Sequence, residues 1–301
     1  MKFSIITPVF NGEKYIEETI QSVLSQEGDF EIEYIIQDGG SEDKTLEIVK
    51  KYDTLLREEK YPLRCKGITF LWFSEKDNGM YDAINKGFQH ATGDIYAYIN
   101  SDDFYLPQGF STVSQVFEKY KEIVWVKGIT DNLEKGETIS AKGTCFLYNQ
   151  KWIQMGIYGR NAYFIQQESV FWKAELWKKI GGIQNGLRYA GDYYLWLEFS
   201  KHTPLYSINK ELACFRKRSN QLSENMEPYR KEQASLSRER GFLNFKIKLF
   251  FEAKQRFVKN IFSPFFMFIY GIFFQNKQTS YIEFDKKNEL CIKKTKSYII
   301  P

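Results

Sequence analysis

The chain has 301 residues, of which 43% are hydrophobic and 27% are charged. This balance excludes an intrinsically disordered protein, because a chain of this length and hydrophobicity can bury a full α/β core. Its four cysteines form no C-x-x-C pair, which argues against a disulfide or zinc framework and favours free thiols in a reducing compartment. The first residues lack the apolar segment of a signal peptide, so we expect a cytoplasmic protein.

Charge is distributed unevenly along the chain. Residues 1–215 hold 24 Lys and Arg against 30 Asp and Glu, a net charge of −6, whereas residues 216–301 hold 18 against 8, a net charge of +10. The last third is therefore a basic, aromatic segment on an acidic body, and its charge suits an anionic lipid surface or a nucleic acid. We expect no nucleic acid, because no recognisable binding motif accompanies the charge.

The first hundred residues alternate between short apolar runs and helical patterns. The predicted strands are 3–9, 34–36, 68–73 and 95–99, and the predicted helices are 13–26, 44–52 and 80–90. This alternation predicts an open parallel sheet with helices on both faces, and ligands bind such sheets at the carboxyl ends of the strands. Every polar loop in this region follows a predicted strand, so we expect the active site at that edge.

Beyond residue 124 the pattern changes to short aromatic runs. Strands are predicted at 124–126, 145–148 and 169–172, and a helix at 192–199. No linker and no internal repeat interrupts this part, so one α/β domain from residue 1 to about 218 is the simplest partition. We expect a nucleotide-sugar-binding half at about 1–104, an acceptor half at about 105–218 and a basic, aromatic helical extension at 219–301.

Five short motifs stand at an end of a predicted strand or at the start of a predicted helix. They are Ile6-Thr7-Pro8-Val9-Phe10-Asn11-Gly12, Asp38-Gly39-Gly40-Ser41, Asp77-Asn78-Gly79-Met80-Tyr81, Ala91-Thr92-Gly93-Asp94 and Asn100-Ser101-Asp102-Asp103. Each is weak alone, but in this order they resemble the signature of family 2 glycosyltransferases, such as those of bacterial O-antigen, exopolysaccharide and colanic acid synthesis. The resemblance implies a GT-A fold, in which a Rossmann-like sheet holds a nucleotide sugar, and an inverting transfer.

The resemblance also implies which residues contact the donor. The residues that border the nucleotide sugar would be Thr7, Pro8, Phe10, Asn11, Asp38, Asp77 and Asp102. The Asp38 carboxylate would accept a hydrogen bond from the base N–H. Taken alone, Asp38-Gly39-Gly40-Ser41 also fits a simple turn before a helix. UDP-sugars are the expected donors by resemblance only.

Asp102 and Asp103 resemble the acidic metal motif of the family, with Asn100 where many relatives carry another aspartate. Carboxylate oxygens suit Mg²⁺ or Mn²⁺, which would neutralise the charge that grows on the leaving diphosphate. The alternative is a solvated turn or a helix N-cap. The family often places a histidine after the last strand of the domain. This chain has Arg216 and Arg218 there, and a guanidinium can hold a diphosphate through two hydrogen bonds.

Asp192, at the start of the predicted helix 192–199, resembles the catalytic aspartate of the family. In an inverting transfer one carboxylate removes the proton of the acceptor hydroxyl as its oxygen attacks the anomeric carbon. Glu168 is the rival base, and an N-cap is the non-catalytic interpretation of Asp192. We expect transfer of a single sugar to a glycan or a polyprenyl-diphosphate-linked acceptor. The alternative function is an inactive nucleotide-sugar-binding subunit, against which the presence of both Asp103 and Asp192 argues.

Residues 246–274 combine positive charge with aromatic side chains. Five basic residues and one acidic residue lie between 246 and 259, and the fourteen residues from 261 to 274 carry no charge. Fourteen are fewer than the roughly 20 residues that span a bilayer, but they suit an interfacial anchor attracted to anionic lipid. The sequence therefore predicts a peripheral protein on the inner face of the plasma membrane. A terminal helix pair packed on the domain is the alternative.

Overall fold

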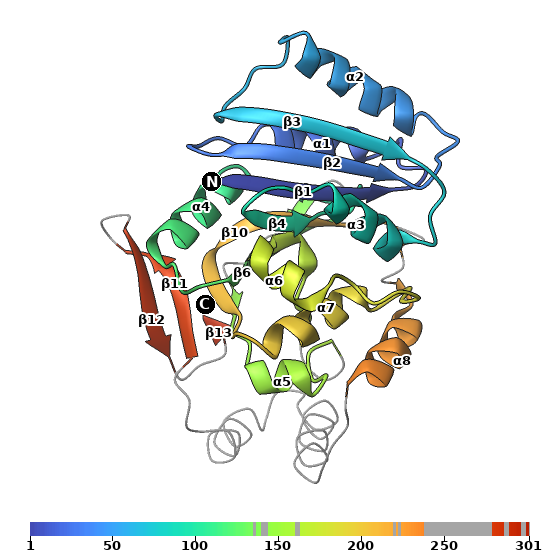
Figure 1. Cartoon of the computed structure of the whole chain (residues 1–301). Coiled ribbons are helices and arrows are strands. Elements are labelled where there is room, and N and C mark those ends of the chain that lie inside the picture. Colours follow the sequence, from blue (N-terminus) through green and yellow to red (C-terminus); the bar gives the residue numbers. More distant parts are fainter. Residues whose placement is uncertain are drawn as a thin grey trace.

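The computed structural model describes residues 1–134, 137–139, 144–159, 163–218, 221, 224–237, 279–285, 289–295 and 299–300. Its main feature is one large mixed sheet with helices packed on it (Figure 1). The strands along the sheet have the order β12-β11-β10-β6-β9-β4-β1-β2-β3. The parts that the structure describes thus have the α/β architecture that the sequence predicts.

The N-terminal half of the sheet is parallel. Its strands are β1 (Lys2–Val9), β2 (Glu31–Asp38), β3 (Gly67–Ser74) and β4 (Ile95–Tyr98). The helices that connect them are α1 (Ile16–Leu24), α2 (Thr45–Arg57) and α3 (Met80–Gln89). β1 lies between β2 and β4 and runs parallel to both. The predicted βα alternation of this half is confirmed.

The other half of the sheet is mixed, so the parallel arrangement predicted for the first hundred residues does not extend into it. β9 (Val170–Lys173) pairs antiparallel with β4 and with β6 (Trp125–Glu134), and β10 (Tyr206–Lys217) is parallel to β6. The short strands β5 (Phe104–Tyr105) and β7 (Glu137–Ile139) add antiparallel pairs. Strand direction depends on the connections between strands, which an apolar run of residues does not reveal.

The remaining helices surround this second half. They are α4 (Gly109–Lys119), α5 (Gln150–Gln154), η1 (Gln167–Ser169), α6 (Ala174–Ile180), α7 (Gly191–Ser200) and α8 (Met226–Leu236). β8 (Cys145–Phe146) and β13 (Ile299–Ile300) form a separate two-stranded sheet.

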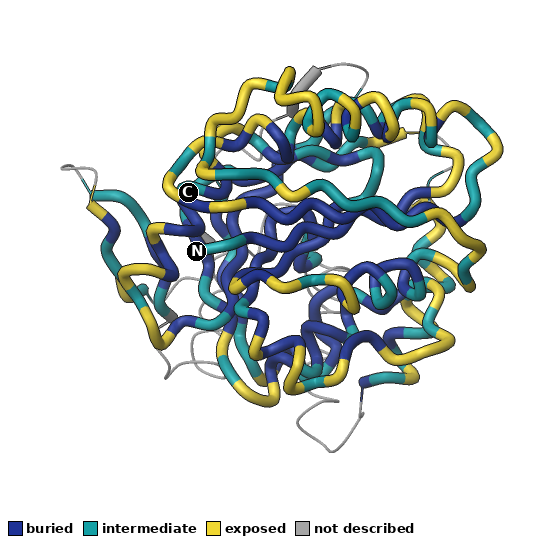
Figure 2. The backbone as a smooth tube through the Cα atoms, turned by 45° about the horizontal axis from the view of Figure 1, so that its top comes forward, coloured by how far each residue is buried: buried dark blue, intermediate teal, exposed yellow. Residues whose placement is uncertain are grey.

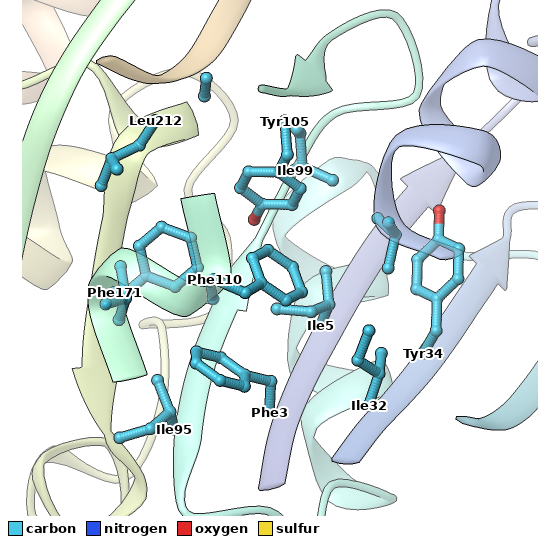
Figure 3. Packing of buried hydrophobic residues seen from close by; sticks show 14 of the residues in the cluster. Phe3, Ile5, Ile32, Tyr34, Ile95, Ile99, Tyr105, Phe110, Phe171 and Leu212 are labelled. Atoms are coloured by element: carbon cyan, nitrogen blue, oxygen red, sulfur yellow. The ribbon is translucent and has the colours of Figure 1, made fainter. Parts of the chain in front are cut away.

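Two apolar cores lie on opposite faces of the sheet. Ile5 packs into one core with residues of α1, α2 and α4, and its neighbour Ile6 packs into the other with residues of α3, α6 and α7. Consecutive residues of a strand point to opposite faces, so β1 needs helices on both sides. Figure 3 shows the first core, where the rings of Phe3 and Phe110 stack with their centroids 4.9 Å apart. Figure 2 shows the central strands as the most buried part of the molecule.

The chain after residue 218 differs from the expected helical extension. β11 (Thr279–Phe284) pairs with β10, and β12 (Leu290–Thr295) pairs with β11, so two late strands extend the main sheet. Ile282 and Leu290 are buried in the first core, so these two strands are part of the packed domain. Residues 246–274 lie outside the described part of the chain. Among the described helices, none is long and apolar enough to cross a membrane.

Candidate active site

The polar loops of the N-terminal half meet at one edge of the sheet. The register pairs Val9 with Asp38 and Asp38 with Ser74, so β1, β2 and β3 end in one row. The two loops that follow β1 and β2 are bonded to each other, because the Asn11 N–H donates to Ser41 Oγ (2.7 Å). Asn11 has a φ of 51°, a left-handed conformation that asparagine tolerates better than most residues. The predicted ligand-binding edge is therefore a rigid, hydrogen-bonded platform.

Asp38 is buried beneath this edge, with 1% of its surface exposed. Its carboxylate accepts hydrogen bonds from the hydroxyl groups of Ser41 (2.5 Å) and Ser74 (2.6 Å). The N–H groups of Gly40 and Ser41 also donate to it, each at 3.1 Å. These donors engage both oxygens, so Asp38 shapes the loop as the turn interpretation predicts. Its contact with a nucleotide base stays a prediction.

Asp77 lies against the same loop. Its Oδ1 accepts from the Gly79 N–H (2.8 Å), and a Cβ atom on Gly39 would come within 2.6 Å of Asp77 Oδ2. Only glycine allows this close approach of a side chain to the backbone. The structure thus brings together the two predicted donor-side aspartates, Asp38 and Asp77.

The other predicted donor residues divide into supporting and exposed positions. Thr7 is buried, and its Oγ1 shares a hydrogen bond with the Tyr34 hydroxyl (3.0 Å) inside the sheet. Pro8 is buried as well, whereas 64% of Phe10 is exposed. Thr7 and Pro8 therefore support the edge from within the core. The Phe10 ring and the Asn11 loop are the parts with surface available to a ligand.

An acidic turn follows β4, and the end of β10 lies beside it because β5 pairs with β10. Asp102 Oδ2 accepts from Arg218 Nε (2.5 Å), and the Asp102 carbonyl accepts from Arg216 Nε (2.9 Å). Asp103 is 1% exposed, and its Oδ1 accepts from the Arg216 N–H (2.8 Å). The structure therefore brings Arg216 to both predicted metal-binding aspartates and Arg218 to Asp102.

The side chains of Arg216 and Arg218 differ in how tightly they are packed. The Arg216 guanidinium forms an ion pair with Glu18 and lies over the rings of Tyr15 and Phe104, 4.8 and 5.6 Å from their centroids. Arg218 is more exposed, and its ion pair is with Asp102. Arg216 is thus held in a packed position, and Arg218 is the arginine that a ligand can reach.

The residues of the acidic turn fit a divalent metal. Among the described residues, no group of three His, Cys, Asp or Glu side chains is placed to hold a metal ion by itself. The buried Asn100 Oδ1 has no hydrogen-bond partner in the described part of the chain, and Asn100 Nδ2 donates to Asp103 Oδ2 at 3.4 Å. Asn100 Oδ1, Asp103 Oδ2 and the Asp102 carboxylate are hard oxygen ligands of the kind that Mg²⁺ and Mn²⁺ prefer. The donor diphosphate would have to complete the coordination.

Glu168 is a second buried carboxylate, 4% exposed, on η1. Its Oε1 accepts from Gln167 Nε2 (3.2 Å), and its Oε2 has no partner among the described residues. Burial raises the pKa of Glu168 to about 7, although the nearby Lys127 ammonium opposes the shift. Glu168 can therefore exchange a proton near neutral pH.

Asp192 lies in the first turn of α7 and is half-buried. Ala190 holds the N-cap position of this helix, so the N-cap interpretation of Asp192 is wrong. Asp192 Oδ1 accepts from the Tyr193 N–H (2.7 Å), and Oδ2 accepts from the Tyr229 hydroxyl (3.4 Å). Burial raises the pKa of Asp192 to about 7, which makes the carboxylate a stronger base than a solvated aspartate.

The carboxylates of both halves share one electrostatic environment. Burial raises the pKa of Asp103 well above its ordinary value, and the charges of Glu168 and Asp102 raise it further. The charge of Asp192 in turn raises the pKa of Glu168. Carboxylates of the predicted donor side and of the predicted acceptor side are therefore near enough for their charges to affect one another.

The sequence motifs did not indicate Tyr229 or Glu232, which both contact the segment around Asp192. These residues lie on α8, beyond the expected end of the domain at residue 218. The one available signal was spacing, because Tyr229, Gln233 and Leu236 recur on one face of a helix.

Comparisons with known proteins agree with this geometry. The family model described as "Glycosyl transferase family 2" matches residues 4–176. An uncharacterised glycosyltransferase of Rickettsia typhi is 26% identical over 205 residues, which are 67% of this chain and 60% of that relative. The minor teichoic acid biosynthesis protein GgaB of Bacillus subtilis is 28% identical over 137 residues, 45% of this chain and 14% of GgaB. The chain thus spans less than two thirds of the length of these relatives.

Two groups of solved structures share the fold. TarS 1–349 of S. aureus in complex with UDP-GlcNAc superposes with a TM-score of 0.59 at 18% identity, over 91% of this chain and 81% of that chain. The mannosyltransferase PcManGT of Pyrobaculum calidifontis in complex with GDP-Man and Mn²⁺ gives a TM-score of 0.54 at 15% identity, over 85% and 70%. The mixed sheet with helices on both faces is consistent with the GT-A fold. Since the family model covers more than half of the sequence, the chain belongs to glycosyl transferase family 2.

Proposed function

We propose that this glycosyltransferase moves a single sugar from a UDP-sugar to a hydroxyl group of a saccharide or lipid-linked acceptor, with inversion at the anomeric carbon. The observation that carries the proposal is the meeting of an acidic, arginine-flanked turn with two carboxylates whose pKa values burial raises to about 7. TarS was solved with UDP-GlcNAc, and GgaB is named for teichoic acid biosynthesis. These relatives support a uridine nucleotide and an acceptor from a cell-surface polysaccharide.

The donor would bind along the edge formed by β1, β2 and β4. The exposed Phe10 ring offers an apolar face to the base, and Asp77 offers a carboxylate beside the loop of Gly39. Asp102 and Asp103 would hold Mg²⁺ or Mn²⁺, which when bound neutralises charge on the departing diphosphate. Arg218 supplies a second positive charge at the same place.

The acceptor hydroxyl would lose its proton to Asp192. As the acceptor oxygen forms its bond to the anomeric carbon, the bond from that carbon to the diphosphate oxygen breaks on the opposite side, so the configuration inverts. Asp192 is a better candidate than Glu168 because its side chain is less buried and can reach an incoming sugar. The Tyr193 N–H and the Tyr229 hydroxyl fix the direction of the carboxylate.

The test is release of nucleoside diphosphate from a panel of UDP- and GDP-sugars, with Mn²⁺ or Mg²⁺ and with glycan or polyprenyl-diphosphate acceptors. We expect acceptor-dependent release of UDP and a product with inverted anomeric configuration by NMR. Release of GDP alone would contradict the proposed donor, and retained configuration would contradict the mechanism. Binding of UDP-sugars without any release would indicate the inactive nucleotide-sugar-binding subunit instead.

A further inference from the structure

The helices α7 and α8 both lie beyond the part of the chain that the family model matches, and α8 packs against α7, which carries Asp192 (Figure 1). Tyr229 and Leu236 of α8 contact an apolar group formed by Ala190, Tyr193 and Leu197. The apolar contacts alone would make α8 an ordinary packing helix. Its polar contacts are more specific, because two of them are made with the segment that holds Asp192.

The first polar contact is made with the proposed base itself. The Tyr229 hydroxyl donates to Asp192 Oδ2 at 3.4 Å, and the ring of Tyr229 packs edge-on against Phe164 with centroids 5.4 Å apart. The ring contact limits the directions in which the hydroxyl can point. Since the Tyr193 N–H bonds to Oδ1, one donor is directed at each oxygen of the Asp192 carboxylate.

The second polar contact is made with the chain that leads into α7. The Glu232 carboxylate accepts three consecutive backbone N–H groups, those of Arg188 (3.0 Å), Tyr189 (2.7 Å) and Ala190 (2.5 Å). The Tyr189 carbonyl accepts from the Tyr81 hydroxyl of α3 (2.9 Å), so this segment is fixed from two sides. Ala190 is the N-cap of α7, two residues before Asp192.

The C-terminal half of α8 is anchored as well. Gln233 is fully buried, and its Nε2 donates to the Tyr158 carbonyl at 2.5 Å. Ser237 lies close to Gly156, because a Cβ atom added to Gly156 would come within 2.9 Å of Ser237 Cβ. α8 is therefore fixed along its length, and its contacts with the Asp192 segment have a defined geometry.

We infer that α8 belongs to the catalytic unit, with Tyr229 as a positioning residue for the Asp192 carboxylate and Glu232 as a positioning residue for the turn that carries it. This inference rests on the proposed role of Asp192 as the base. The catalytic unit then extends to residue 237 at least, beyond the boundary at 218 that the sequence predicts.

The test separates positioning from mere stability through the pH dependence of kcat. Removal of the hydroxyl in Tyr229→Phe removes a donor that favours ionised Asp192, so the pKa of Asp192 rises. We expect the acidic limb of the kcat profile to shift to higher pH by about half a unit. At pH values below the pKa of Asp192 this shift lowers kcat about threefold. The other groups that interact with Asp192, Tyr81 of α3, Tyr98 of β4 and Glu168 of η1, are unchanged in this variant.

Glu232→Gln tests the second contact. We expect a lower kcat with the pH limb and the donor KM unchanged, because the amide binds the three N–H groups less tightly and leaves the donor edge intact. Glu227→Gln is the matched control, since Glu227 is exposed on the same helix and, within the described part of the chain, forms its ion pair with Lys231 one turn away (2.7 Å). Circular dichroism and thermal unfolding establish that each variant is folded.

Three outcomes are distinguishable. A shifted limb in Tyr229→Phe with a parental limb in Glu227→Gln supports the inference. An inactive Asp192→Asn protein together with a parental pH profile in Tyr229→Phe overturns the inference and leaves the proposed function in place. Full activity of Asp192→Asn overturns the inference together with the proposed role of Asp192 as the base. If Glu232→Gln fails to fold, the pH profile of Tyr229→Phe still tests the inference, because this variant lacks one hydroxyl group only.

Discussion

Arg218 Nε donates to Asp102 Oδ2 at 2.5 Å, so the carboxylate that the sequence assigns to the nucleotide sugar is paired with a cation. Both side chains reach solvent, and exposed ion pairs contribute only about 0–1 kcal/mol. A bound diphosphate would offer Arg218 a more highly charged partner. We therefore expect the guanidinium to turn from Asp102 to the donor at little cost in stability.

The first prediction concerns the two arginines. Arg218→Gln should raise the donor KM by about tenfold or more, as expected for one lost hydrogen bond between charged groups, without lowering the melting temperature. Arg216→Gln should lower the melting temperature, because Arg216 packs on two rings and pairs with Glu18. Steady-state kinetics and thermal unfolding measure both. A parental donor KM in Arg218→Gln would remove this residue from the donor site.

The second prediction concerns Asp103. Because Asp103 is buried and accepts from the Arg216 N–H, Asp103→Asn is a gentler change than alanine, and the relief of repulsion from Asp102 and Glu168 should keep the protein folded. Metal-dependent transfer should fall by about a hundredfold or more, since the amide is a weaker ligand for Mg²⁺ or Mn²⁺. The measurement is UDP release across a Mn²⁺ titration. Equal turnover by variant and parent would contradict the metal assignment.

The third prediction compares the two candidate bases. Asp192→Asn should lower kcat by about 10²–10⁴-fold while the donor KM stays near its parental value, because the amide keeps the shape but cannot take a proton. Glu168→Gln, a change of the same kind at a more buried site, should lower kcat by less than about tenfold. The reverse order of effects would make Glu168 the base.

The fourth prediction is a pH profile. The base must be ionised to accept a proton, and burial raises the pKa of Asp192 to about 7. The rate should therefore rise with pH through about 7 and level off above it, whereas a solvated aspartate would give a limb near 4. Residual activity of Asp192→Asn should lack this limb. A kcat that is flat between pH 5 and 8 in the parent would rule out Asp192 as the titrating group.

The N-terminal part of the fold could be predicted because its signals are local. Apolar runs of strand length alternate with helical spacing from β1 to β4, and each polar motif stands at a strand end. The strand β9 was predicted as well, but its antiparallel direction could not be, because that direction depends on its partners β4 and β6. The expected helical extension did not anticipate β11 and β12, which extend the sheet at β10.

The sequence predicted where the candidate site residues lie in the fold but not how exposed they are. Asp38, Asp77, Asp102 and Asp103 lie at one edge of the sheet, as the motifs predict, and their contacts with a donor or a metal stay predictions. They could not show that Asp38 is engaged by four donors from its own surroundings, because hydroxyl groups such as that of Ser74 come from a neighbouring strand. The contacts of α8 are of the same kind, since helical spacing alone does not reveal that Tyr229 meets Asp192.

The last prediction concerns residues 246–274, which lie outside the described part of the chain. We propose that this segment holds the protein on the inner face of the plasma membrane, where a polyprenyl-linked acceptor would be found. It has a net charge of +4 over residues 246–259 and an uncharged aromatic run that follows. Each basic residue near an anionic surface contributes about 1 kcal/mol, a contribution that salt weakens. Insertion of Phe and Ile side chains adds a contribution that salt does not screen.

The test is co-sedimentation of the full chain with vesicles that contain phosphatidylglycerol. Binding should weaken in high salt but persist, and neutral vesicles should bind less. Replacing Lys246, Lys248 and Lys254 by Gln should reduce partitioning by about a hundredfold at low salt, since three residues at about 1 kcal/mol each correspond to roughly two factors of ten. The matched control replaces Lys60, Lys66 and Lys201, three exposed lysines of the sheet domain, and should bind like the parent. If the first triple variant pellets as well as the parent, or if the parent does not pellet with anionic vesicles at all, the segment is no membrane anchor, and its apolar side chains would have to pack on the domain or on a second copy.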